Sequence, residues 1–76
     1  MASTDFPQTL GARIREARLA LDLTVEQMAP KVGVTMRTLS RYERGETKQL
    51  SFDRLADISK VTGRPVSWFI TGEEPA

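Results

Sequence analysis

The chain has 76 residues with no cysteine and no histidine, and its formal net charge at pH 7 is +1. This length predicts a single domain over 1–76 with one small core, and the missing residue types exclude disulfides, thiolate zinc sites and cysteine or histidine catalysis. A ligand pocket usually needs about 300 Å³ or more, which is too large for this chain, so we expect no enzyme, no metal and no cofactor.

The composition and the N-terminal residues indicate where the protein acts. No apolar run approaches the ~20 residues that a membrane span requires. The first residues, Met1 to Asp5, lack the basic and apolar segments of a signal peptide. We therefore expect a cytoplasmic protein with no membrane partner.

The charges are distributed unevenly along the chain. Between Lys31 and Leu50, five cations and two anions give a local net charge of +3, whereas the remainder of the chain carries −2. A basic middle in a nearly neutral chain is typical of a one-sided contact with a polyanion. A solvated basic surface would give the same pattern.

The first predicted helix spans about Phe6 to Leu21. Asp5 can cap it, and the apolar residues that recur at helical spacing are Leu10, Ile14, Ala17 and Leu21. Gly11 costs about 1 kcal/mol relative to alanine inside a helix, and it permits a neighbour to pack closely. We expect Asp22 in left-handed geometry at the helix end.

Three further helix starts share one pattern, a hydroxyl residue between apolar neighbours. The three expected caps are Thr24, Thr35 and Ser51, and Thr24 forms a capping box with Gln27. The glycines expected to end these helices are Gly33, Gly45 and Gly63. The side chains expected to face the core are Met28, Ala29 and Val32 in the second helix, Leu39 and Tyr42 in the third, and Phe52, Leu55, Ala56 and Ser59, with Ile58 beside them, in the fourth.

A last short helix is predicted over about Val66–Thr71, followed by Gly72. It carries three large apolar side chains, those of Trp68, Phe69 and Ile70. These are many for a terminal helix to bury. Either all three pack in the core of one molecule, or some of them form a contact between two copies.

The segment from Val25 to Arg44 joins two short helices through Gly33, with only about two residues before the next cap. Such a tight connection makes the helices cross steeply, and the small Ala29 lies where they approach. The first turn and the outer face of the later helix, about Met36–Glu43, then stay exposed. This arrangement predicts a helix-turn-helix over about 25–44 that presents a helix to the DNA major groove.

Six local motifs follow one another along the chain: Leu10 to Arg15 with Arg18, Leu23 with Thr24, Met28 with Ala29, Gly33 to Thr35, Leu39 to Gly45, and Trp68 to Gly72. With them the sequence resembles the phage repressor and Cro-type (XRE-like) helix-turn-helix family over about Leu10 to Gly72. The resemblance implies an all-α, five-helix, lambda-repressor-like DNA-binding domain, with an ordered core of about 6–72. It also implies a transcriptional regulator, expected to be a repressor, that binds an inverted-repeat operator in double-stranded DNA as a homodimer.

Three positions depart from the pattern of this family. Val25 stands where the family often has a glutamine that contacts a phosphate, so that contact is not expected here. Pro30 lacks the N–H that would bond to the Glu26 carbonyl, and we expect the second helix to be bent or shortened there. Pro65 stands where a capping serine is usual.

The exposed face of the third helix carries the candidate base contacts. Arg37 and Arg41 are neighbours one turn apart, and arginine can bond to two acceptors of guanine. Arg37 is the better candidate for a base, and Arg41 is a candidate for a base or a phosphate. Met36 is a candidate for contact with a thymine methyl, or else for packing under the second helix.

The candidate contacts to the DNA backbone are hydroxyl groups at helix starts and basic residues after the third helix: Thr24, Thr35, Thr38, Arg44 and Lys48. Hydroxyl and N–H groups at a helix N-terminus suit a phosphate oxygen, although capping alone explains Thr24 and Thr35. Arg18 and Glu43 match positions that form a structural, partly buried ion pair in the resembled family.

A second class of function stays open, that of an antitoxin or another protein-interaction module whose DNA binding is secondary. An exposed surface at Trp68, Phe69 and Ile70 would favour a protein partner. The cations of the third helix favour DNA, and with it a location at the nucleoid in the cytoplasm.

Overall fold

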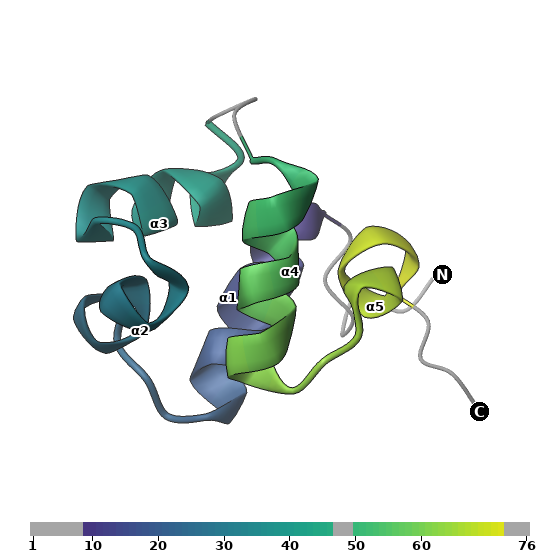
Figure 1. Ribbon diagram of the computed structural model, residues 1–76, viewed down its shortest axis with the longest axis horizontal. Coiled ribbons are helices and arrows are strands. Elements are labelled where there is room, and N and C mark those ends of the chain that lie inside the picture. The colour runs from purple at the N-terminus through teal and green to yellow at the C-terminus, as the bar shows by residue number, and fades with distance from the viewer. Residues whose placement is uncertain (1–8, 47–49, 73–76) are drawn as a thin grey trace, which may run out of the picture.

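The computed structural model describes residues 9–46 and 50–72, and these form five α-helices. The helices are α1 (Leu10–Ala20), α2 (Val25–Val32), α3 (Met36–Arg44), α4 (Phe52–Thr62) and α5 (Val66–Thr71). Helices α1 and α4 lie in the middle, with α2 and α3 on one side and α5 on the other (Figure 1). The predicted all-α, five-helix architecture is confirmed. No helix among the described residues is long and apolar enough to cross a membrane.

The first helix begins later than predicted. Thr9 has an extended backbone with φ −116° and ψ 156°, and its hydroxyl accepts a hydrogen bond of 3.0 Å from the N–H three residues on. Thr9 is therefore the N-cap, and the helix starts at Leu10 instead of Phe6. The predicted cap, Asp5, lies outside the described residues, as does Phe6. At the other end, Asp22 has φ 57°, as predicted.

The next three helices begin and end as the local pattern predicts. The caps Thr24, Thr35 and Ser51 each accept a hydrogen bond of 3.1 Å from the N–H three residues on. Thr24 and Gln27 complete the capping box, since the Thr24 N–H donates to the Gln27 side chain at 2.9 Å. Each helix ends at a glycine in left-handed geometry, with φ between 71° and 90°. Four hydroxyl and amide side chains thus fix where α2, α3 and α4 start.

A bend or a shortening is expected at Pro30, and of these two the shortening does not occur, because α2 continues through Pro30 to Val32. Pro30 is exposed, whereas Met28, Ala29 and Val32 on both sides of it are buried. Packing of these side chains against the core therefore offsets the hydrogen bond that the proline cannot make.

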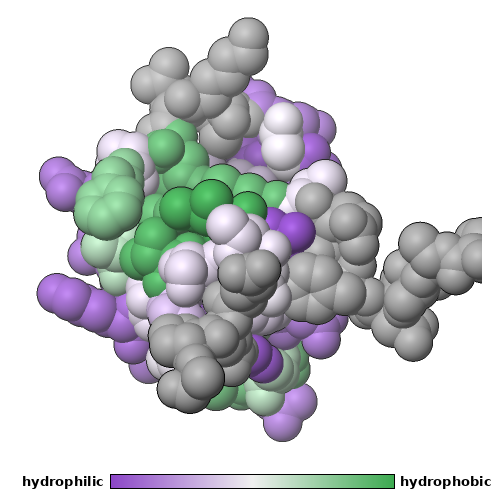
Figure 2. Space-filling model, turned by 90° about the vertical axis from the view of Figure 1, so that its right-hand side faces the viewer, coloured by the Kyte–Doolittle hydropathy of each residue, from purple (hydrophilic) through white to green (hydrophobic). Residues whose placement is uncertain are grey.

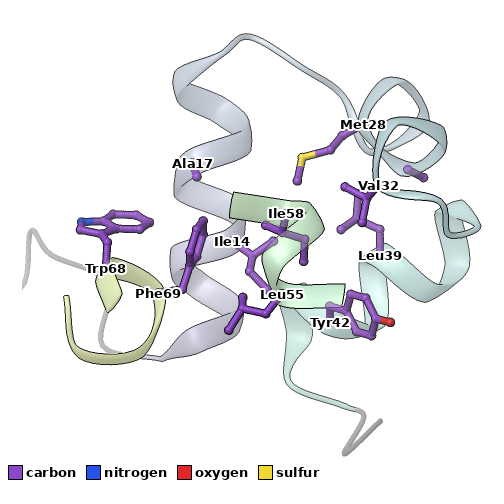
Figure 3. Packing of buried hydrophobic residues seen from close by; sticks show 11 residues of the cluster. Ile14, Ala17, Met28, Val32, Leu39, Tyr42, Leu55, Ile58, Trp68 and Phe69 are labelled. Carbon is purple, nitrogen blue, oxygen red and sulfur yellow. The ribbon is translucent and has the colours of Figure 1, made fainter. Parts of the chain in front are cut away.

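One hydrophobic cluster draws on all five helices (Figure 3). Each helix contributes one side chain that is completely enclosed, and these are Ile14, Met28, Leu39, Ile58 and Phe69. The ring of Trp68 meets the ring of Phe69 edge to face, with 5.0 Å between the centroids. Because every helix depends on the same cluster for burial, the helices are expected to fold and unfold as one unit.

Two predicted core residues are exposed, Leu21 by 45% and Phe52 by 69% of their surface. Leu21 follows the last residue of α1 as its C-cap, where the backbone has left the helical path that the spacing assumed. The buried side chains of α4 are Leu55 and Ile58, and Phe52 lies roughly a quarter turn from the middle of that face. Ala56 and Ser59 are only partly buried.

Candidate nucleic-acid interface

The orientation of α3 depends on its close contact with α1. A Cβ atom on Gly11 would lie 2.5 Å from the carbonyl oxygens of both Tyr42 and Glu43, a distance that real Cβ contacts do not reach. Only glycine therefore lets the C-terminal end of α3 approach α1 this closely. The close packing predicted at Gly11 is confirmed.

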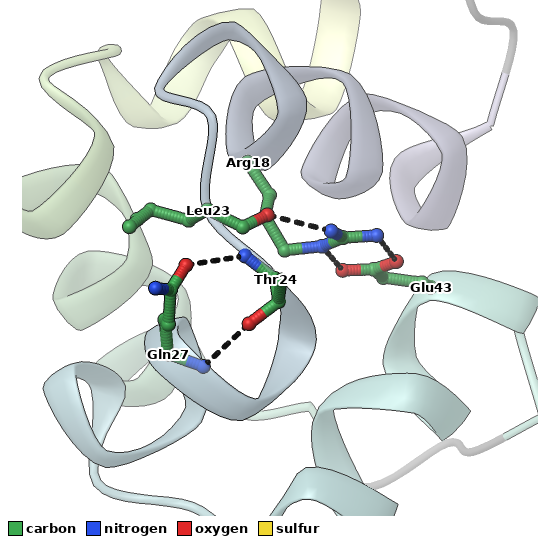
Figure 4. Close-up of polar contacts among 5 residues, drawn as sticks. All are labelled: Arg18, Leu23, Thr24, Gln27 and Glu43. Atoms are coloured by element: carbon green, nitrogen blue, oxygen red, sulfur yellow. Dashed lines mark hydrogen bonds and ion pairs between the residues drawn. The ribbon is translucent and has the colours of Figure 1, made fainter.

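An ion pair holds the same end of α3 (Figure 4). The Arg18 guanidinium donates to the two carboxylate oxygens of Glu43 at 2.7 and 3.0 Å and to the carbonyl of Leu23 at 2.8 Å. The two charged side chains expose only 9% and 6% of their surface. The hydrogen bonds to Glu43 raise the pKa of Arg18, against the opposing effect of burial. One side chain of α1 thus fixes both the residue before the α2 cap and the last turn of α3.

A second arginine, which the sequence analysis did not single out, holds the turn between α2 and α3. Arg54 of α4 donates to the carbonyl of Val32, the last residue of α2, at 2.9 Å and to Asp57 at 3.2 Å. Its guanidinium lies so close that a Cβ on Gly33 would be 3.0 Å from it. The sequence signal for this contact is limited to the spacing of Arg54 and Asp57 on one helix face.

The outer face of α3 carries the predicted base contacts. Arg37 and Arg41 are exposed, and neither guanidinium forms a hydrogen bond or ion pair with another residue in the described part of the chain. Met36 is 50% exposed, so it does not pack under α2. Three side chains at the start and along one side of α3 are therefore accessible to a partner.

The threonine hydroxyl groups at the starts of α2 and α3 differ in the hydrogen bonds that they form. The Thr35 hydroxyl accepts from the Thr38 N–H at 3.1 Å and donates to the Thr38 hydroxyl at 3.0 Å. This leaves the hydrogen of the Thr38 hydroxyl able to donate outward. The Thr24 hydroxyl accepts from the Gln27 N–H, and its own hydrogen has no acceptor within the described residues.

Two cations at or beyond the end of α3, Arg44 and Lys48, are predicted to contact the DNA backbone. Arg44 is in an exposed ion pair with Glu46, with distances of 2.9 and 3.1 Å between its nitrogens and the two carboxylate oxygens. The hydrogen bonds from Arg44, and then its charge, hold the pKa of the Glu46 carboxyl below its usual range. Lys48 lies outside the described residues.

The three apolar residues of α5 have separate roles. Trp68 and Phe69 are in the core, with 4% and 0% of their surface exposed, whereas Ile70 is 55% exposed. Of the three side chains that the sequence offers for a contact between two copies, only Ile70 is exposed on this helix. Phe52, which the sequence analysis assigned to the core, is the other large apolar side chain of α4 and α5 that is exposed. Figure 2 shows apolar surface gathered on the face of the molecule that holds α5.

The sequence matches the model of one protein family and is similar to curated proteins. A family model described as helix-turn-helix matches residues 14–69. An uncharacterized transcriptional regulator in the ATPase CF(0) region of Rhodospirillum rubrum is 37% identical over 65 residues, which cover 86% of this chain and 59% of that protein. An uncharacterized HTH-type transcriptional regulator of Sinorhizobium medicae is 35% identical over 60 residues, covering 79% and 42%. The chain spans about half the length of these relatives, which are named as regulators and not as enzymes.

Solved structures are similar over most of the chain. The P22 c2 repressor in complex with a synthetic operator has a TM-score of 0.80 and 28% identity, covering 88% of this chain and all of that one. The DNA-binding domain of the same repressor in solution also has a TM-score of 0.80. SinR, in a complex with the SinI protein, has a TM-score of 0.77 and 27% identity, covering 83% and 61%. The predicted lambda-repressor-like fold is confirmed.

Proposed function

The chain belongs to the helix-turn-helix family, and from this premise we propose that it is a transcriptional repressor that binds an inverted-repeat operator as a homodimer. The observation that carries the proposal is the outer face of α3. There Arg37 and Arg41 are exposed and form no hydrogen bond or ion pair with another described residue. The opposite face of the helix is fixed to α1 by Gly11 and by the ion pair of Arg18. A rigid helix with free cations on its outer side suits reading of the major groove.

In this proposal, the first turn of α3 enters the groove. Arg37 contacts a guanine, Met36 lies against a thymine methyl, and Arg41, one turn further, reaches a base or a phosphate. The Thr38 hydroxyl and the start of α2 at Thr24 donate to phosphate oxygens, which set the register of the protein on the duplex.

The proposed dimer uses the exposed apolar side chains of α4 and α5. Ile70 and Phe52 are 55% and 69% exposed, and the apolar surface around α5 is visible in Figure 2. A symmetric dimer would place two copies of α3 at half-sites about one helical turn, or ~34 Å, apart. It would also add buried surface to a domain whose own core is small.

Selection of bound duplexes from a random DNA library, at salt near 150 mM, tests the proposal. We expect enrichment of an inverted repeat whose half-sites are about 10 base pairs apart, centre to centre. Replacing Arg37 by alanine should abolish the preference for one guanine, whereas Arg15→Ala, which removes the same charge from an exposed site on α1, should keep it. A library with no enriched sequence would contradict the proposal.

A second candidate function is a protein-interaction module of the antitoxin kind. It is favoured by the similarity to SinR, whose structure was determined in a complex with the SinI protein. In the same selection, this function predicts no enriched repeat. It also predicts that Ile70→Glu abolishes binding of a partner protein, while Arg37→Ala leaves it unchanged.

A further inference from the structure

The chain turns back on itself directly after α3 and places an acidic residue beside Arg44, the last residue of that helix. Gly45 has φ 71°, and the Glu46 N–H donates to the Arg41 carbonyl at 3.0 Å. This closure of the helix end places Glu46 next to the last turn of α3 rather than away from it.

The Glu46 carboxylate is held by Arg44 in the way that arginine holds a phosphate. Two guanidinium nitrogens of Arg44 lie 2.9 and 3.1 Å from the two carboxylate oxygens. This paired geometry is the one with which arginine binds planar or tetrahedral oxyanions. Both side chains remain about half exposed, at 58% and 52%, so a solvent-borne anion can reach the same guanidinium.

The electrostatic neighbourhood of Glu46 includes a second arginine of α3. The pKa of the Glu46 carboxyl is lowered mainly by Arg44 and to a smaller extent by the charge of Arg41. The pKa of Arg44 is raised in turn by Glu46. The carboxylate is therefore ionised at neutral pH and lies within the field of two arginines of α3.

We propose that Glu46 occupies the phosphate-binding position of Arg44 in the free protein, so that the DNA backbone must displace its carboxylate. This inference rests on the proposed function, because it requires that the face of α3 bind DNA. A phosphate that approaches Arg44 must break two hydrogen bonds and is also repelled by the displaced carboxylate. Glu46 is thus an affinity-limiting residue of the DNA site, and it acts on operator and non-operator duplexes alike.

The test is titration of a fixed 20-base-pair duplex of arbitrary sequence with Glu46→Gln, which keeps the shape of the side chain and removes its charge. We expect affinity at 50 mM salt to rise about 3- to 5-fold. The plot of log affinity against log salt should steepen by up to about 0.9, because the charge that Arg44 presents to the phosphate is no longer offset by the Glu46 carboxylate. Glu16→Gln, an equal change of charge at an exposed site on α1, should leave that slope unchanged.

A double variant separates the local effect from overall charge. If Glu46 acts through Arg44, then adding Glu46→Gln to Arg44→Gln should raise affinity no more than Glu16→Gln does. A rise that is as large in the Arg44→Gln background as in the wild type would overturn the inference. The same holds if Glu46→Gln leaves the affinity and slope unchanged while the wild type binds the duplex. Absence of any duplex binding by the wild type at 50 mM salt would overturn both this inference and the proposed function.

Discussion

The Arg13 guanidinium of α1 donates to the carbonyl oxygen of Ile70 at 2.9 Å, although 57 residues separate the two in the sequence. It also donates to the carbonyl of Phe69 at 3.0 Å, and Arg13 is 8% exposed. Carbonyls in the last turn of a helix have no partner within that helix, and a cation there also suits the helix dipole. Arg13 therefore supplies the C-terminal cap of the short helix α5 and fixes the backbone of the exposed Ile70.

We predict that Arg13→Met lowers the free energy of unfolding by about 2 kcal/mol, because two hydrogen bonds to a charged donor are lost. Urea unfolding measures this change. The matched control is Arg15→Met, which replaces an exposed arginine on the same helix and should change stability by less than about 0.5 kcal/mol. Equal effects of the two variants would mean that Arg13 does not act as a cap.

The packing of α3 on α1 leads to a second prediction. Gly11→Ala improves helix propensity by about 1 kcal/mol, but its Cβ would lie 2.5 Å from two backbone carbonyls. Backbone cannot give way as a flexible side chain can, so we expect a net loss of about 1–3 kcal/mol. Thermal unfolding measures the loss, and a raised melting temperature would contradict the contact.

We predict that removing one partner of the Arg18–Glu43 ion pair lowers the free energy of unfolding more than removing both partners does. Arg18→Met leaves the Glu43 carboxylate with 6% of its side chain exposed and no counter-charge, and we expect a loss of about 3 kcal/mol. The double variant Arg18→Met with Glu43→Leu should be more stable than Arg18→Met alone, because it buries no unpaired charge. A double-mutant cycle by urea unfolding measures the coupling, and additive losses would argue against it.

Substitutions of the two threonines at the start of α3 should separate an effect on stability from an effect on DNA binding. Thr35→Ala removes the cap and should lower the free energy of unfolding by about 1 kcal/mol. Thr38→Val keeps the shape and the cap but removes the hydroxyl that remains able to donate. We expect it to melt close to the wild type and to bind duplex DNA more weakly, as measured by titration. If Thr38→Val binds as the wild type does, the hydroxyl is not a backbone contact.

The sequence predicts a contact well when the two residues that form it are close together along the chain, and poorly when they are far apart. The caps Thr24, Thr35 and Ser51 bond to groups three residues away, so local rules suffice to find them. The same local pattern places Leu39 and Tyr42 inside and Arg37 outside. The same rules misplace the start of α1, because Asp5 with its following proline is a stronger signal than Thr9, which is the actual cap.

Contacts between distant segments could not be predicted in this way. Arg54 meets Val32, and Arg13 meets Ile70, only after the helices have packed. The spacing of Phe52 fits a helical face and predicts a core position, but the buried face of α4 is the one with Leu55 and Ile58. The engagement of Arg44 by Glu46 depends on the left-handed turn at Gly45. Charge counting alone treats both residues as free.

The last prediction concerns the proposed dimer, whose contact depends on which apolar side chains remain outside the core. Ile70→Glu and Phe52→Glu each put a charge in place of an apolar side chain, on α5 and α4 respectively, that is more than half exposed. Neither change disturbs a buried side chain, so the melting temperature of the monomer should change little. Burial of a charge at an interface is unfavourable, so both variants should be monomeric at tens of micromolar where the wild type is dimeric. Sedimentation equilibrium measures this.

Leu19→Glu is the control for these variants, because Leu19 is an exposed leucine of α1 with 44% of its surface accessible. It should leave the association state unchanged. On DNA, Ile70→Glu should weaken binding to a duplex with two half-sites and leave binding to a single half-site unchanged, because only the former requires two copies in contact. A wild-type protein that is monomeric both free and on the inverted repeat, or a loss of association with Leu19→Glu of the same size, would exclude Ile70 and Phe52 as the dimer contact.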